Sequence, residues 1–425
     1  INDNKDMSTS PRRVTINEDW VVVILGFLII FLALGGIQPP KPSFSWNSTE
    51  ELANKVFSAA NLSVLGVQFA FVLLIACIGV FLTGRPLKSF IYSFPFVYIL
   101  SVLAMVLAGN DQVKALNLEA VIFSLTLGLI VGNFFKLPEW FRSALSTEMF
   151  VKIGLVILGT SIIFGDILEA GSYGLLQAII VVLSVWYFAF WLCKKMKIDK
   201  ELTMMISSAV SICGVTAAIA ASGAIKGDSK KLSYVISLVL ITAIPMMIGM
   251  PFLAQYMGLS QEVTGAWIGG SIDTTGAVVA SGTLVGETAL KISAIVKFSQ
   301  NVLLGIAAFA ISVYWAYTNT KGPEGQFEKP SLGAIWERFP KFVLGFVAAS
   351  ILFSFFIEPQ TIDGVKSGLK NIQTLWFVLA FTSIGLETKF SDLLKSSNRK
   401  PLYAFVIAQS FNILVTLVIA YLLFG

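Results

Sequence analysis

The sequence predicts an all-α polytopic membrane protein, and three observations support this prediction. Hydrophobic residues make up 56% of the 425 residues, charged residues only 13%, and the mean hydropathy is +0.81, which is unlike a soluble globular chain. The apolar runs are about 17 to 25 residues long, enough to cross a hydrocarbon core of roughly 30 Å as helices. A membrane β-barrel would show alternating segments of about ten residues instead.

The apolar runs predict about thirteen transmembrane helices after a polar N-terminal tail, residues 1–19. The expected spans are residues 20–37, 65–82, 89–108, 118–135, 148–164, 174–193, 202–222, 232–257, 263–283, 292–316, 340–357, 371–386 and 401–424. With the N-terminus in the cytoplasm, 19 Lys and Arg residues fall inside and 9 outside, as the positive-inside rule expects. Lys226, Lys230 and Lys231 are exceptions, because they fall outside.

Residue types that are missing or scattered exclude several classes of function. The chain has no histidine, so it lacks the commonest metal ligand and general base, and proton chemistry falls to Asp, Glu or Lys. Cys77, Cys193 and Cys213 are too far apart to indicate a disulfide framework or a zinc site. No nucleotide-binding loop and no basic patch interleaved with aromatics is present. We therefore expect no enzyme activity, no cofactor and no nucleic-acid partner, and the net positive charge implies only the lipid bilayer as a charged partner.

Two pairs of similar phrases indicate an internal repeat. VKIGLVILG begins at Val151 and VKFSQNVLLG at Val296, 145 residues apart, while SICG at 211–214 resembles SIGL at 383–386, 172 residues apart. The polar segment 317–339, which we expect to be a cytoplasmic loop, accounts for the difference between the two separations.

This offset predicts two five-helix repeats, residues 118–257 and 263–424. They begin after opposite numbers of membrane crossings, so they are inverted relative to each other. Residues 20–108 would hold additional N-terminal helices.

The stretch AVSICGVTAA, residues 209–218, has small and hydroxyl side chains where a lipid-spanning helix would have Leu and Ile. Inverted repeats with interrupted helices are typical of secondary transporters, whose sites lie near the bilayer midplane. We expect crossed discontinuous helices broken at 211–214 and 383–386, whose half-helix N-termini favour an anion. The alternative is that small residues only allow close helix packing. The candidate substrate-binding residues here are Ser211, Cys213, Gly214 and Thr216, with Thr382 and Ser383 in the second repeat.

Asp273 is the leading candidate for ion coupling, because it lies about ten residues into its expected span and a carboxylate there is costly unless paired or hydrated. It could exchange a proton or bind Na⁺ beside Thr274 and Thr275, with Ser271 nearby. The alternative is a structural role, either as a pair with Lys297 or as a satisfied cap on a broken helix.

Lys152 and Lys297 lie about five residues into their expected spans. Turned inward they would form a positive pair for a small oxyanion, but they could also snorkel to the interface. Gln300 and Asn301 follow one turn after Lys297 as neutral donors, or as amides that bond between helices.

Three regions carry a resemblance to a known family. AVSICGVTAA, GGSIDTTGAVVASG at 269–282 and SIGLETKFSDLLKSSNRKPL at 383–402 resemble the signature regions of the YeiH family, also called the sulfate exporter family. The resemblance covers roughly residues 90–425. It implies a homodimeric bacterial inner-membrane protein, distantly similar to sodium/proton antiporters and bile-acid symporters, with a panel domain and a core domain. Many members carry a His-Glu pair and a Gln where this chain has Asp273, Thr274 and Ala277, whereas Lys297 and Lys152 match basic positions.

The leading functional hypothesis is a secondary transporter that exports a small anion, such as sulfate, sulfite or a sulfonate, coupled to H⁺ or Na⁺. One alternative is a cation/proton antiporter that uses Asp273. Another is a channel or sensor built on the same fold.

Overall fold

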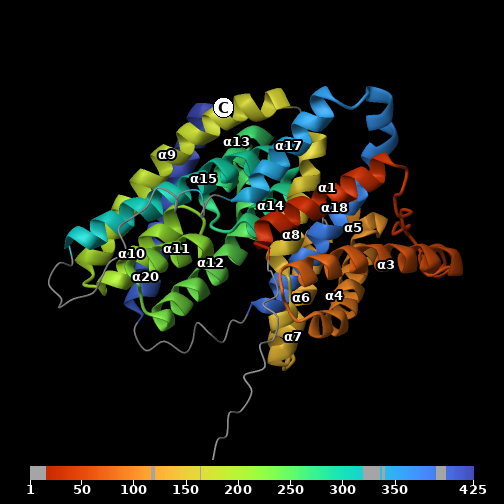
Figure 1. Ribbon diagram of the computed structural model, residues 1–425, viewed down its shortest axis with the longest axis horizontal. Helices are drawn as coiled ribbons and strands as arrows, with labels where there is room; N and C mark the ends of the chain where they lie inside the picture. The colour runs from red at the N-terminus through yellow and green to blue at the C-terminus, as the bar shows by residue number, and fades with distance from the viewer. Residues whose placement is uncertain (1–15, 116–119, 163, 319–335, 337–339, 389–398) are drawn as a thin grey trace, which may run out of the picture.

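The structure is a computed structural model, and it describes residues 16–115, 120–162, 164–318, 336, 340–388 and 399–425. Almost all of the expected tail, 1–19, and of the expected loop, 317–339, lies outside these residues. The described part is nearly all helical (Figure 1). Its helices are α1 (Glu18–Leu34), α2 (Thr49–Glu51), the π-helix η1 (Leu52–Val56), α3 (Ala59–Leu82), α4 (Leu87–Ala108), α5 (Asp111–Ala115), α6 (Ala120–Phe134), α7 (Glu139–Ala144), α8 (Thr147–Leu158), the 3₁₀ turn η2 (Gly159–Ser161), α9 (Phe164–Lys195), α10 (Lys200–Ser211), α11 (Val215–Ile225), α12 (Ser229–Tyr256), α13 (Gln261–Ser271), α14 (Thr275–Val285), α15 (Glu287–Thr318), α17 (Lys341–Phe355), α18 (Pro359–Glu387) and α20 (Lys400–Phe424).

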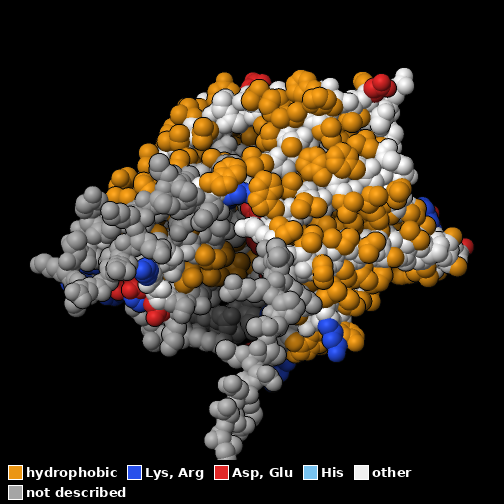
Figure 2. All heavy atoms as spheres, in the orientation of Figure 1, with side chains coloured by type: hydrophobic (Ala, Val, Ile, Leu, Met, Phe, Trp, Pro, Cys, Tyr) orange, Lys and Arg blue, Asp and Glu red, His pale blue; other side chains and the backbone are white. Residues whose placement is uncertain are grey.

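Seven helical segments of the described part are long and apolar enough to cross a membrane. They are Ala59–Leu82, Leu87–Ala108, Glu139–Ser161, Ile167–Lys195, Tyr234–Tyr256, Glu287–Trp315 and Lys400–Phe424. Shorter apolar helices accompany them, and hydrophobic side chains cover much of the described part of the face that Figure 2 shows. The prediction of a polytopic all-α membrane protein is confirmed, whereas the exact count of thirteen spans is not.

Residues 202–222, expected as one span, form two arms of a helical hairpin, α10 and α11, which we call hairpin 1. Lys231 Nζ lies 2.7 Å from Asp199 Oδ1, and the backbone N–H of Asp228 donates to Glu201 Oε2 at 3.0 Å. The chain therefore leaves α11 beside the start of α10. Arms of 12 and 11 residues reach about 17 Å, roughly half a bilayer.

Residues 263–283 likewise form a hairpin, α13 and α14, which we call hairpin 2. The backbone N–H of Ala289 donates a hydrogen bond to Oε1 of Gln261, the first residue of α13, at 3.4 Å. A methyl group on Gly286 would lie 2.6 Å from that same oxygen. The end of α14 thus returns to the start of α13. The predictions that residues 263–283 and residues 202–222 each form a single membrane span are therefore wrong. Hydropathy reports the length of an apolar run and cannot report that a short turn reverses it.

The two hairpins open toward opposite ends of α12. The open end of hairpin 1 lies beside the start of α12, through the pair formed by Lys231 and Asp199, whereas hairpin 2 begins soon after α12 ends. Lys226 and Lys231 therefore lie on the same side as Lys194 and Lys195, at the end of α9. If the N-terminus is cytoplasmic, as the sequence predicts, these lysines then lie on the inner side and no longer depart from the positive-inside rule.

The expected helix break at 383–386 is not present, because α18 continues without interruption to Glu387. Gly385 instead permits close packing of α18 on α6: a methyl group there would lie 2.6 Å from the carbonyl oxygen of Leu125 and 2.7 Å from Gly128 Cα. The packing interpretation of these small residues is correct at this position. The interruption in the C-terminal half lies at residues 272–274. The inverted five-helix repeats remain a prediction.

Candidate functional site

The tips of the two hairpins are short turns at which each helix reverses. Hairpin 1 turns at residues 212–214, and Gly214 takes φ = +60°, a left-handed conformation that favours glycine. Hairpin 2 turns at residues 272–274, where Thr274 Oγ1 accepts a hydrogen bond from the N–H of Ala277 at 3.3 Å and caps α14. Each turn therefore places one helix C-terminus and one helix N-terminus inside the protein.

Lys297 joins the two tips. It lies ten residues into α15, about 15 Å along the helix, and only 1% of its surface is exposed. Its Nζ donates to the carbonyl oxygens of Ile212 at 2.7 Å and Ile272 at 2.8 Å, and to Gln300 Oε1 at 2.9 Å. Ile212 and Ile272 are the C-cap residues of α10 and α13, so one ammonium group stabilises two negative helix ends. These bonds use its three donors, and Lys297 does not snorkel.

Three amide side chains complete this connection. Gln300 Nε2 donates to the carbonyls of Ser211 at 3.0 Å and Gly270 at 3.2 Å. From α20, Asn412 Nδ2 donates to the carbonyls of Val210 at 3.0 Å and Ser271 at 3.2 Å, and Gln409 Nε2 donates to that of Ser271 at 2.7 Å.

Gln409 and Asn412 were not among the expected site residues. The signal that could have found them is two amides, three residues apart, in an otherwise apolar span. Amides in a membrane helix need partners inside the protein.

Asp273 lies at the tip of hairpin 2 and is 2% exposed. Its Oδ2 has no hydrogen-bond partner in the described part of the chain, and the same is true of Ser271 Oγ, Asn301 Oδ1 and Gln409 Oε1. The amide nitrogens of Asn301 and Gln409 bond to Thr275 Oγ1 at 3.3 Å and to the Ser271 carbonyl, which places these oxygens around residues 271–275. Buried polar atoms without partners are uncommon in proteins, so this cluster is suited to an ion, a proton or water.

A small cavity of about 80 Å³ adjoins the N-terminal ends of α11 and α14, where Val215, Thr274 and Gly276 line it. The first N–H groups of a helix have no partner within the helix, and this end carries positive dipole charge. Glu148 and Glu387 also line the cavity, and Glu387 Oε1 accepts a hydrogen bond from Thr147 Oγ1 at 2.7 Å. The site thus combines two positive helix ends with carboxylates.

The structure does not bring Lys152 to the hairpin tips. Its Nζ lies 3.0 Å from Asp19 Oδ1, 3.3 Å from Glu18 Oε1 and 3.7 Å from Glu148 Oε2. Asp19 also accepts from the N–H of Lys341 at 2.9 Å, so this network ties α1 to α8 and α17. The expected positive pair of Lys152 and Lys297 is not formed, because Lys152 is held by three carboxylates.

The remaining expected residues differ in position. Cys213 and Gly214 are buried in the turn of hairpin 1, whereas Thr216 is exposed on α11. Ser211 Oγ donates to the carbonyl of Ser207 at 2.7 Å. On α18, the Thr382 hydroxyl lies 2.8 Å from that of Ser101 in α4, and Ser383 Oγ donates to the carbonyl of Leu379 at 2.8 Å. The second-repeat hydroxyls therefore serve packing within and between helices.

This fold and site define a helical membrane protein with a membrane-embedded polar centre. Comparison with known proteins places the chain in a family: residues 93–404 match the family described as Conserved hypothetical protein 698, and the chain belongs to it, the YeiH or UPF0324 family.

Two relatives illustrate the match. A UPF0324 membrane protein of Rhodopirellula baltica is 41% identical over 350 residues, which cover 80% of this chain and 64% of the relative. One of Nitratidesulfovibrio vulgaris is 38% identical over 374 residues, covering 85% of this chain and 62% of the relative. The chain thus spans less than two thirds of the length of these relatives. Among solved structures, a sodium proton antiporter from Methanocaldococcus jannaschii aligns with 10% identity and a TM-score of 0.20, over 78% of this chain and 99% of that one.

Proposed function

We propose that this protein is a secondary active transporter of the bacterial cytoplasmic membrane that moves a small anion, such as sulfate, sulfite or a sulfonate, coupled to H⁺ or Na⁺. The observation that carries the proposal is the meeting of two half-membrane hairpins at Lys297, which bonds to the carbonyls of Ile212 and Ile272. Non-helical backbone at membrane depth is tolerated where it is buried in protein or lines a polar cavity. A site between two such tips can open to either side by modest movement of one hairpin.

The chemistry of the tips suggests how the anion and the coupling ion depend on each other. The N-terminal ends of α11 and α14 attract an anion, with the hydroxyls of Thr274 and Thr275 as further donors. The charged carboxylate of Asp273 repels an anion at the same place. Protonation of Asp273, or Na⁺ bound to it, removes this repulsion, so anion and cation occupy the site together. Lys297 holds the tips in place, and a direct bond to the anion would require it to exchange one of its three partners.

Two observations favour a second candidate, a cation/proton antiporter. Glu148 and Glu387 line the cavity that leads to the tips, and four oxygen atoms around residues 271–275 lack partners. Carboxylates at the cavity attract cations, and a group of oxygen ligands suits Na⁺ better than an oxyanion. In this case Asp273 binds the transported ion itself.

Transport by the purified protein in proteoliposomes separates these functions. For the anion transporter we expect uptake of labelled sulfate or methanesulfonate that depends on a pH or Na⁺ gradient and is lost in Asp273→Asn. The control is Asp111→Asn, an exposed carboxylate remote from the tips. Exchange of Na⁺ for H⁺ without any anion would instead establish the antiporter. Current without coupling would establish a channel, and no transport of any kind would favour a sensor.

We also propose a homodimer with a cytoplasmic N-terminus. Native mass spectrometry in nanodiscs that detects only monomers would overturn the first part. Accessibility of an N-terminal tag from the outer side of the cell would overturn the second.

A further inference from the structure

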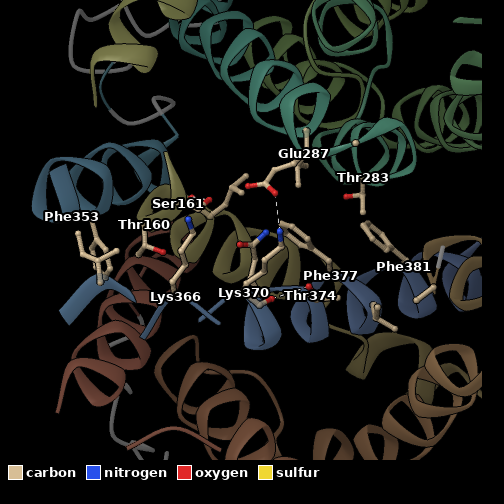
Figure 3. A pocket seen from close by; sticks show the side chains of 17 residues that line it. Thr160, Ser161, Thr283, Glu287, Phe353, Lys366, Lys370, Thr374, Phe377 and Phe381 are labelled. Carbon is tan, nitrogen blue, oxygen red and sulfur yellow. Dashed lines mark hydrogen bonds and ion pairs between the residues drawn. The ribbon is translucent and has the colours of Figure 1, made fainter. Parts of the chain in front are cut away.

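A second cavity, of about 280 Å³, lies between α18 and the facing ends of α8, α14 and α15 (Figure 3). It includes Thr283 and Gly286, at the end of hairpin 2 opposite to its tip. It shares no lining residue with the cavity at the tips, so it is a separate site.

The lining residues of α18 are ordered by polarity along one face of the helix. Lys366, Lys370, Gln373, Phe377 and Phe381 line the cavity at positions i, i+4, i+7, i+11 and i+15, which share a helix face. The polar half begins near the start of α18, and the aromatic half follows about 10 Å further along the helix. A ligand that fills this cavity therefore meets cationic groups at one end and aromatic rings at the other.

The polar end has an excess of positive charge. Figure 3 shows Lys366 and Lys370 reaching from α18 into the same space, with Glu287 facing them from α15. Lys370 Nζ lies 2.9 Å from Glu287 Oε2, and Lys291 also pairs with Glu287, at 3.3 Å. Lys366 has no carboxylate within 4 Å among the residues that the structure describes. Like charges four residues apart on a helix repel each other, so an anion between the two lysines would be stabilised.

Gln373 is an independent indication of a ligand. It is only 7% exposed and lines the cavity, yet its amide has no hydrogen-bond partner in the described part of the chain. The hydroxyls of Thr160, Thr283 and Thr374 instead donate to backbone carbonyls three or four residues earlier in the chain, at 2.7 to 2.8 Å. The amide group of Gln373 opens into the cavity, where it is available to bond to a ligand. The donors that the cavity offers to a ligand are therefore Lys366, Gln373 and Lys370, which lie together at its polar end, and Lys370 is shared with Glu287.

We propose that this cavity binds an amphipathic organic anion, a sulfonate or carboxylate that carries a short alkyl or aryl group. The acidic head accepts hydrogen bonds from Lys366, Lys370 and Gln373, and the apolar group packs on Phe377 and Phe381. Inorganic sulfate leaves the aromatic half empty, and a neutral aromatic compound leaves the lysines without a counter-charge. This binding site stands whether or not the protein transports its ligand.

Replacing Glu287 should change the affinity for the ligand in the opposite direction to replacing either lysine. In the free protein its carboxylate competes with the ligand for Lys370. Removing this charge makes Lys370 available, so Glu287→Gln tightens binding, whereas Lys366→Gln and Lys370→Gln weaken it. A general loss of structure cannot produce a gain in affinity.

The experiment is calorimetric titration of 2-naphthalenesulfonate into the full chain in phosphatidylcholine nanodiscs, with empty nanodiscs as the blank. We expect Lys366→Gln to raise the Kd about tenfold, the loss typical of a hydrogen bond to a charged group. Lys41→Gln, which removes the same charge from an exposed position outside the cavity, leaves the Kd unchanged. Glu287→Gln lowers the Kd about threefold or more. An unchanged Kd in both Lys366→Gln and Lys370→Gln overturns the proposal.

Two further ligands test the amphipathic requirement. Methanesulfonate keeps the acidic head and lacks the aromatic group, whereas 2-naphthalenemethanol keeps the rings and lacks the charge. We expect each to bind at least about tenfold more weakly than 2-naphthalenesulfonate. If either binds equally well, the cavity does not recognise an amphipathic anion.

Discussion

Gly214 and Asp273 are in contact across the two hairpin tips: a methyl group on Gly214 would lie 2.9 Å from Asp273 Cβ. The turn of hairpin 1 therefore packs directly on the candidate coupling residue of hairpin 2. Because Gly214 also has φ = +60°, the contact and the turn both require glycine. Movement of one hairpin relative to the other must alter the surroundings of the Asp273 carboxyl.

Gly214→Ala should destabilise the protein by about 2 kcal/mol or more, through backbone strain and overpacking. The new methyl group would also lie 2.6 Å from Val239 Cγ1. Thermal unfolding in detergent measures the effect. The control is Gly249→Ala in α12, where no atom lies within 4 Å of the added methyl group, and we expect it to be neutral or slightly stabilising. Equal melting temperatures for the two variants would contradict the close contact.

Lys297→Gln should destabilise the protein by about 2 to 4 kcal/mol, because it removes a buried charge that stabilises two helix ends. Lys291→Gln, in the same helix, loses only a partly exposed ion pair and should cost less than about 1 kcal/mol. The measurement is the melting temperature, with ligand affinity determined on the same samples.

The double variant Lys297→Gln with Asp273→Asn distinguishes two roles of Lys297. If Lys297 mainly balances the charge of Asp273, the second change restores part of the stability, and a double-mutant cycle gives a coupling energy. If it mainly caps α10 and α13, the two losses add. Reduced anion affinity in a variant that remains folded would support direct anion binding, whereas unchanged affinity would exclude it.

Hairpin 1 predicts that Lys195→Cys and Lys226→Cys react with a membrane-impermeant maleimide from the same side of the membrane. A single span at 202–222 would place them on opposite sides. Met257→Cys, which follows the apolar helix α12, should react from the other side. The native cysteines are buried or half-buried, so labelling reports on the introduced residues.

The pair of Asp199 and Lys231 at the open end of hairpin 1 should make stability depend on pH. Partial burial acts to raise the pKa of Asp199, but hydrogen bonds from Lys231 and from the N–H of Leu202 outweigh it, and this pKa is lowered. A carboxyl group with a lowered pKa stabilises the fold above its unfolded pKa of about 3.9, and this contribution is lost as the pH falls through the folded value. The hydrogen bond to Asp199 raises the pKa of Lys231, so its contribution is lost only as the pH rises above about 10.4.

Asp199→Asn isolates this ion pair, because Asn retains the N-cap of α10. We expect a loss of about 0.5 to 1 kcal/mol at pH 7, small because the pair is partly exposed. The difference from the unchanged protein should begin to shrink as the pH falls below the unfolded pKa of about 3.9, and it should vanish once the pH is below the lowered pKa of Asp199 in the folded protein. A difference that persists at low pH would mean that the pair is not its source.

Gly385→Ala tests the packing of α18 on α6 and should cost about 1 to 3 kcal/mol, because the methyl group meets the backbone of residues 125 and 128. Gly66→Ala in α3, with no atom within 4 Å, is the matched control. Full tolerance of Gly385→Ala, as judged by the melting temperature, would revive the idea of an open break at 383–386.

The sequence alone determined the class of the protein, because composition and the length of apolar runs directly reflect a bilayer environment. It also identified Asp273, Lys297, Gln300 and Gly214 as unusual at membrane depth, where polar groups and flexible turns are costly unless they have partners. The tertiary structure decided the direction of the chain at residues 212–214 and 272–274. Hydropathy is the same for a span and for a hairpin of equal length. The structure also decided the partners: Lys297 meets Ile212 and Ile272, whereas Lys152 meets Glu18 and Asp19. These residues are 25 to 134 positions apart in the chain, and contacts over such separations depend on helix packing that no local pattern records.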